Sequence, residues 1–175
     1  MTESVLFKTR PKLPDARNQR VGWGRLLGAA NAFALADLAR QEDRLILCLA
    51  RDPRHADQLE AEVAYFAGDD VAVLHFVDWE TLPYDSFSPH QDIVSQRLET
   101  LAQLPGLRKG VVIVSAPTLL NRLPPVDYVA LQSIRLRTGQ ELPRDEFIRA
   151  LGAAGYLRVP QVPEHGEYAV RGSLL

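Results

Sequence analysis

The sequence predicts an α/β protein in which a mainly parallel sheet carries helices on both faces, followed by a smaller α+β part. Three apolar runs, at 45–50, 71–76 and 111–115, are continuous rather than alternating, as in strands of a buried parallel sheet. Stretches of helical period separate these runs, which is the pattern of βαβ units. After Pro124-Pro125 the apolar residues alternate instead, as in half-exposed strands.

The elements of the first part follow from their periodicity. Residues 1–20 are polar and contain prolines, so we expect a flexible N-terminal arm. In the helix at 54–67, Leu59, Val63 and Phe66 share one face and Gly68 ends it. The other helices are expected at 29–40, at 91–104 and at 117–123. The apolar face of the helix at 91–104 is expected to consist of Ile93, Val94, Leu98, Leu101 and Leu104.

The second part predicts a different arrangement. An alternating strand at 131–137 turns at Thr138-Gly139, and a helix at 143–154 points Phe147, Ile148 and Leu151 inward. Strands at 156–162 and 168–175 flank the loop PEHGE. We therefore divide the chain into the arm, an α/β domain at 21–125 and the start of an α+β domain at 126–175. Because an apolar run continues to Leu175, we expect this last domain to be truncated and the chain to be an N-terminal fragment of a longer protein.

The composition limits the function classes. The formal charge of −2 does not support a general electrostatic affinity for nucleic acid. Cys48 is the only cysteine, so no disulfide within the chain and no cysteine-rich metal site is expected. Its place inside an apolar run indicates a small buried hydrophobe. The N-terminus has no apolar run that resembles a signal peptide or a membrane span, so we expect a cytoplasmic protein with no membrane partner.

The stretch GRLLGAANAFALADLAR at 24–40 resembles a phosphate-binding loop that lacks the lysine and the hydroxyl needed to bind a nucleotide phosphate and Mg²⁺. Glycines precede an apolar helix, but no Gly-Lys dipeptide occurs anywhere in the chain. If Gly28 takes the place of the middle glycine, Arg25 replaces the first glycine and Ala30 the last. Asn31 then replaces the phosphate-binding lysine, and Ala32 replaces the hydroxyl that would hold Mg²⁺. We expect no bound cofactor and no ATP hydrolysis by this chain.

The stretch DWETLPYDSFSPHQD at 78–92 allows two interpretations. Its acids and His90 could serve as ligands or acid–base groups, although no metal-binding histidine spacing is present. The favoured interpretation is a structured loop in which Trp79, Tyr84 and Phe87 pack down and Pro83 and Pro89 stiffen the path. Residues 90–92 then begin the next helix. No catalytic residue and no metal site are expected.

Ser115 and four arginines complete the candidate residues. Ser115 ends a strand without a catalytic partner and is predicted to cap a helix. Arg135, Arg137, Arg158 and Arg171 fall on roughly alternating strand positions of the second part. They form either a solvated face or a protein-binding face, since arginine suits bidentate pairing with carboxylates.

Three long segments then carry a family resemblance: DWETLPYDSFSPHQDI at 78–93, SQRLETLAQLP at 95–105 and EHGEYAVRGSLL at 164–175. With them the chain resembles the N-terminal region of Mfd, the bacterial transcription-repair coupling factors. The resemblance extends from about residue 20 to the end. It implies a module similar to the excision-repair protein UvrB, with a degenerate RecA-like, P-loop-like domain and an inserted α+β domain.

The resemblance also implies partners. The inserted domain recruits UvrA, and Arg171 matches an arginine of that interface in the family, with Arg135, Arg137 and Arg158 as weaker candidates. UvrB carries a DNA-clamping hairpin that has no counterpart after residue 84 here. RNA polymerase and double-stranded DNA would be bound by later domains of the parent. ATP and Mg²⁺ would serve the motor domains of that parent, an ATP-dependent DNA translocase.

Two alternatives to a non-catalytic docking module stay open at this point. One is a nucleotide-binding domain with an atypical phosphate loop. The other is a DNA-binding domain that uses the arginines, whose salt-sensitive affinity would be lost on substitution of Arg135 and Arg137.

Overall fold

The computed structural model describes residues 13–24, 26–82, 84–134 and 136–175. The chain divides into two compact units. The first consists of the described residues up to Asp78 together with Gly106–Asn121, and the second of Trp79–Pro105 and Arg122–Leu175. The predicted division into domains at 21–125 and 126–175 stays a prediction.

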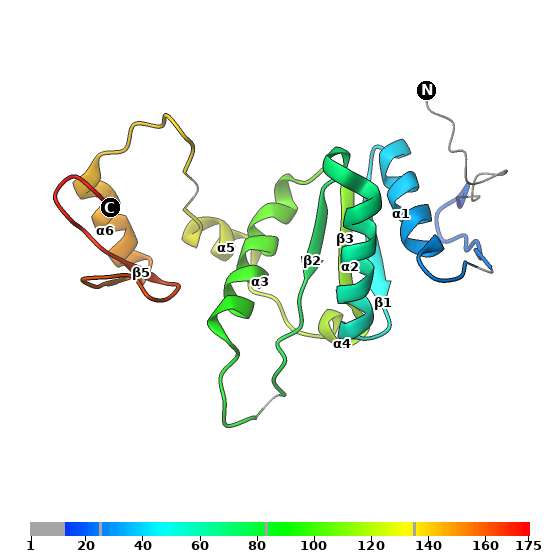
Figure 1. The fold of residues 1–175 in the computed structure, drawn as a ribbon, viewed down its shortest axis with the longest axis horizontal. Helices are drawn as coiled ribbons and strands as arrows, with labels where there is room; N and C mark the ends of the chain where they lie inside the picture. Colours follow the sequence, from blue (N-terminus) through cyan, green and yellow to red (C-terminus); the bar gives the residue numbers. More distant parts are fainter. Residues whose placement is uncertain (1–12, 25, 83, 135) are drawn as a thin grey trace. The chain divides into compact units, whose positions relative to one another are not determined.

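A three-stranded parallel sheet forms the centre of the first unit, and its strands are β1 (Leu45–Ala50), β2 (Val73–Phe76) and β3 (Gly110–Ser115). Their order is β1-β3-β2, so β3 lies in the middle. Helices α1 (Ala30–Gln41) and α2 (Pro53–Ala67) lie side by side against the sheet (Figure 1). The predicted α/β class, with a parallel sheet flanked by helices, is confirmed.

The core lies between this sheet and the two helices. Ile113 and Val63 are fully buried in it, together with small residues such as Ala36 of α1. Phe33 of α1 and Phe66 of α2 meet edge to face, with ring centroids 5.4 Å apart. Each fully buried aliphatic side chain contributes about 1.5–3 kcal/mol to folding. The two helices are therefore held to the sheet mainly by apolar burial.

Strand β1 differs from the expectation that both its faces are covered. Its residues alternate, because Ile46 and Cys48 pack against the core while Leu47 and Leu49 are 60% and 54% exposed. β1 is one of the two edge strands of this sheet, and within the described residues only the side of β1 that faces the helices is covered. Cys48 is partly buried, and burial raises the pKa of its thiol, so it stays neutral as a small hydrophobe would.

The second unit contains α3 (Gln91–Gln103), α5 (Val126–Gln132) and α6 (Arg144–Ala153). Helix α3 is where it was predicted, and of its expected apolar face Ile93, Val94, Leu101 and Leu104 are partly buried while Leu98 is not. Leu98 is 46% exposed, whereas Arg97 is 2% exposed and lies over the Trp79 ring at 4.0 Å from its centroid. A cation over an indole face can be buried at this position because the ring attracts the guanidinium.

The predicted strand at 131–137 is wrong. Pro125 precedes α5, Asp127 lies in its first turn, and Val129 is buried. An acid near the helix N-terminus is favourable, whereas a strand requires a neighbour to pair with. No strand pairs with 133–137 within the described residues. The turn at Thr138-Gly139 is confirmed, with Gly139 at φ +82°.

The two last predicted strands are much shorter than expected. β4 (Leu157–Arg158) and β5 (Glu167–Tyr168) pair in parallel over two residues each. Arg171 and Leu174 then form an isolated antiparallel bridge around a turn at Gly172. The remaining elements are α4 (Ala116–Leu119), shorter than the predicted helix at 117–123, and the 3₁₀ turns Gly68–Asp70 and Leu104–Gly106.

Gly110 begins the central strand at a position that excludes a side chain. Its φ is +140°, and a Cβ atom built there would lie 2.5 Å from the carbonyl oxygen of Ala72. That oxygen also accepts a hydrogen bond from the backbone N–H of Val111 at 2.8 Å. The Ala72 carbonyl therefore lies close to Gly110 because it pairs with the start of β3 through Val111.

We expect Gly110→Ala to lower the free energy of unfolding by about 1–3 kcal/mol, because the backbone is strained and the carbonyl must move. Urea denaturation followed by circular dichroism measures the change. Gly106→Ala is the matched control, since a Cβ there meets no atom within 4 Å. Equal stability of the two variants would contradict the steric argument.

Candidate functional site

The loop before α1 contains Gly28 and leads to Asn31 and Ala32, the positions that the sequence predicts to replace those of a phosphate-binding loop. Gly28 adopts φ +56°, and the backbone N–H of Ala30 donates to the carbonyl of Leu27 at 3.2 Å. The Asn31 side-chain oxygen accepts a hydrogen bond from the backbone N–H of Ala32 at 2.8 Å, and Ala32 is fully buried. The side chain of Asn31 therefore occupies one of the backbone N–H groups at the start of α1. The predicted role of Arg25 falls on a residue outside the described ranges.

Lys109 does not replace the missing lysine. Its ammonium donates to the carbonyl of Arg40 at 2.9 Å, near the C-terminal end of α1. A helix of this length spans about 18 Å, so this charge lies at the end opposite Gly28 and Asn31. A cation beside the last carbonyls of a helix is favourable. Lys109 therefore stabilises α1 instead. Lys8 and Lys12 lie outside the described residues.

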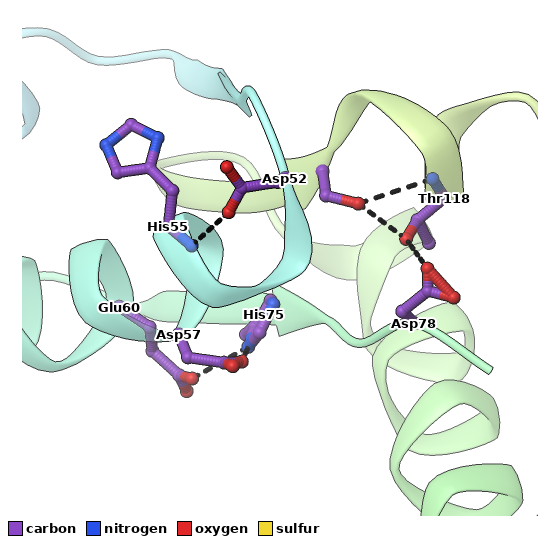
Figure 2. A network of polar contacts seen from close by, with 8 residues as sticks. Asp52, His55, Asp57, Glu60, His75, Asp78 and Thr118 are labelled. Atoms are coloured by element: carbon purple, nitrogen blue, oxygen red, sulfur yellow. Dashed lines mark hydrogen bonds and ion pairs between the residues drawn. The ribbon is translucent and has the colours of Figure 1, made fainter. Parts of the chain in front are cut away.

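The carboxyl ends of the three parallel strands meet at one edge, where open α/β sheets bind ligands. At this edge Thr118 donates to the Asp78 carboxylate at 2.9 Å (Figure 2). The hydroxyls of Ser115 and Thr118 are 2.7 Å apart. Ser115 also accepts from the Thr118 backbone N–H at 3.3 Å, which confirms its predicted role as a helix cap. Ser115 and Thr118 are each 1% exposed. These polar groups therefore satisfy one another.

Asp52 has a similar local role at the end of β1. Its side chain caps α2 by accepting from the backbone N–H of His55 at 2.8 Å. This hydrogen bond is the largest cause that lowers the pKa of Asp52 below its ordinary value of 3.8. Desolvation opposes it, and the neighbouring Arg51 adds a smaller lowering. The resulting stabilisation is complete above that ordinary pKa and is lost as the pH falls through the lowered value.

His75 was missed by the sequence prediction. Its side chain is 6% exposed, its Nδ1 lies 2.8 Å from Glu60 Oε2, and Asp57 of the same helix lies 3.8 Å away (Figure 2). The spacing of Asp57 and Glu60 puts both on one face of α2. The spacing of the two acids can be seen in the sequence. That His75 of β2 faces these two acids cannot be seen there. No group of three metal-ligating side chains is found among the described residues.

The acidic stretch at 78–92 is a structured loop, as favoured, but its aromatic residues do not all pack down. Trp79 is partly buried against Arg97, whereas Tyr84 and Phe87 are 105% and 80% exposed. That part of the prediction is wrong, because the local turn projects these rings away from the chain. Pro83 lies outside the described residues.

The end of this loop follows the prediction. Residues 90–92 begin α3, with His90 as its N-cap and Asp92 in the first turn. Asp92 lies 3.3 Å from His90 Nδ1 and 2.9 Å from His165 Nε2. The loop is thereby joined to the segment that precedes β5.

The structure brings two of the four candidate arginines into one region. Arg158 lies exposed in β4 and pairs in register with Tyr168. Arg171 is exposed, and its guanidinium donates to the carbonyl of Pro160, two residues after Arg158, at 3.3 Å. Arg137 is exposed in the turn before Gln140, and Arg135 lies outside the described residues.

Comparison with known proteins finds homologues over most of the chain. A family model of the UvrB interaction domain matches residues 134–175, which include Arg158 and Arg171. The transcription-repair-coupling factor of Escherichia coli is 44% identical over 166 residues, or 95% of this chain. The homologous factors of Haemophilus influenzae and Myxococcus xanthus are 40% and 34% identical, over 95% and 90% of the chain.

The chain is homologous to the transcription-repair-coupling factors. It spans 14% of the length of these three relatives. The resemblance seen in the sequence is therefore confirmed, including the UvrB interaction domain at its C-terminal end. In the part of this transcription-repair-coupling factor homologue that the structure describes, no helix has both the length and the hydropathy that a membrane crossing requires.

The buried hydroxyl of Thr118 gives a test of the polar network. We expect Thr118→Val to lower the free energy of unfolding by about 1–3 kcal/mol, because it removes a donor to Asp78 and leaves the Ser115 hydroxyl without its partner. Thermal and urea unfolding measure the loss. Thr118→Ser retains the hydroxyl and should be the more stable of the two. The opposite order would show that the methyl packing of Thr118 matters more than its hydrogen bonds.

Proposed function

We propose that the chain is a non-catalytic, UvrB-like docking module that recruits UvrA to stalled transcription in nucleotide excision repair. The observation that carries the proposal is the exposed Arg171 within the segment that matches the UvrB interaction domain. Its guanidinium contacts a backbone carbonyl and forms no ion pair with another described residue. A planar cation of this kind suits bidentate pairing with a partner's carboxylate.

Arg158 supports the same surface, since its strand lies next to the carbonyl that Arg171 contacts. In the parent protein, docking would be coupled to ATP-driven translocation on double-stranded DNA and to binding of RNA polymerase. Those activities, with their ATP and Mg²⁺, would belong to domains outside this chain. The expected compartment is the cytoplasm.

We expect Arg171→Ala to weaken UvrA binding by about 1–3 kcal/mol, because a charged hydrogen bond across the interface is lost. Titration of UvrA into the 175-residue chain by calorimetry or interferometry measures the change. Arg54→Ala is the control, because Arg54 is an exposed arginine on α2 of the first unit. Binding that is unchanged by Arg171→Ala would refute the role of this residue. No binding by the unaltered chain would refute the proposed function.

A nucleotide-dependent function is the competing proposal, and the loop before α1 argues against it. Asn31 is neutral and Ala32 has no hydroxyl, so neither can hold a nucleotide phosphate together with Mg²⁺. Calorimetry with ATP and Mg²⁺ should therefore give no saturable binding by residues 1–175 and no phosphate release. Micromolar, Mg²⁺-dependent affinity would contradict the non-catalytic proposal.

A further inference from the structure

The segment from Trp79 to Asp92, here called the aromatic loop, exposes three large apolar side chains. Leu82 is 74% exposed, Tyr84 is 105% exposed and Phe87 is 80% exposed, all within six residues. Single exposed hydrophobic residues are ordinary, but several gathered on one short segment are typical of an interaction site. Aromatic side chains also supply large contact area at low entropic cost, so they often anchor protein interfaces.

The aromatic loop holds these side chains outward by a defined turn. The backbone N–H of Leu82 donates to the Asp85 carboxylate at 2.7 Å, and the backbone N–H of Asp85 donates back to the Leu82 carbonyl at 3.1 Å. Glu80 and Tyr84 have φ values of +57° and +75°, which side-chain-bearing residues seldom adopt. Strained backbone of this kind gathers where a segment is shaped for a ligand or partner.

Both ends of the aromatic loop are anchored. At its start Trp79 stacks against the buried guanidinium of Arg97, and at its end His90 caps α3. The exposed side chains between them therefore project from a fixed base. A partner that binds such a preorganised loop loses little conformational entropy.

The charge of the aromatic loop selects the kind of partner. Glu80, Asp85 and Asp92 are acidic, and no lysine or arginine occurs from 79 to 92. The next cation along the chain, Arg97, is 2% exposed and adds little positive surface. An acidic rim repels nucleic-acid phosphates and favours a protein surface that carries lysines or arginines around an apolar pocket.

The aromatic loop is continuous with the proposed docking surface inside the second unit. The Asp92 carboxylate at its end lies 2.9 Å from His165 Nε2. A groove of about 740 Å³ is lined by residues 88–92 and 162–165. Residues 162–165 lead into β5 and then to Arg171. One partner can therefore contact both regions.

From these observations we infer that the aromatic loop is a second contact for the same protein partner, UvrA. Tyr84 and Phe87 would enter an apolar pocket on that protein, and Glu80 would face basic residues around it. This inference rests on the proposed function, since it adds a surface to the same partner.

The test compares UvrA binding to the 175-residue chain and to a Tyr84→Ala/Phe87→Ala double variant. We expect the double variant to bind about 10- to 100-fold more weakly, the usual range for loss of interface anchors. Tyr65→Ala is the matched control, because Tyr65 is 82% exposed on α2 of the first unit. Both variants remove exposed side chains, so circular dichroism should show unchanged folding.

A second variant tests the charge argument. Glu80→Gln should lower the association rate for UvrA and reduce its dependence on salt, because one acidic group of the rim is removed. An association rate with unchanged salt dependence would overturn the charge complementarity on which the choice of partner rests.

The results of these experiments distinguish a failure of this inference from a failure of the proposed function. If Arg171→Ala weakens UvrA binding but the double variant binds like Tyr65→Ala, the aromatic loop is not a contact and the proposed function stands. If the unaltered chain does not bind UvrA, both are overturned. If the double variant instead loses affinity for a single-stranded oligonucleotide while its UvrA affinity is unchanged, the aromatic loop serves base stacking and the inference is wrong.

Discussion

The first unit depends on the burial of the central strand β3. All six of its residues are buried, and it pairs in parallel with β1 on one side and β2 on the other. Val111 and Ile113 contact the core beneath α1 and α2, while Val112 and Val114 are buried on the opposite face. Since a shift of one residue would exchange these two faces, the burial of β3 fixes the register of both neighbours. The sheet edge where candidate ligands would bind is set by the same register.

That register also determines which polar groups meet at the carboxyl edge of the sheet. It places Ser115 and Thr118 near Asp78, so that Ser115 and Thr118 share a hydrogen bond and Thr118 donates to Asp78. In many open α/β sheets the groups at this edge bind a ligand. Here the groups drawn in Figure 2 hold helices and strands together. The hydrogen bonds and ion pairs of these groups in the first unit are made with one another, whereas the exposed Arg158, Arg171, Tyr84 and Phe87 lie in the second unit.

The sequence predictions were correct mainly for the segments whose apolar side chains are buried in the core. The apolar runs that became β1 and β3, and the face of α2 with Leu59 and Val63, were predictable because long apolar patterns dominate local preference. The stretch at 131–137 was mispredicted because a short alternating pattern does not say whether a partner strand is present. The prediction for Leu98 failed because the helix buries Arg97, which makes a cation–π contact with Trp79 from outside the helix.

The sequence by itself determined the α/β class, the homology to the transcription-repair-coupling factors and the presence of Asn31 and Ala32 at the start of α1. These three conclusions depend only on which residues occur and how they are spaced along the chain. Only the tertiary structure decided that His75 faces Glu60, that Asp92 reaches His165 and that Tyr84 stands exposed. These facts depend on which segments meet in space and on which side chains the turns leave uncovered. Local pattern does not encode contacts between residues that are far apart in the chain.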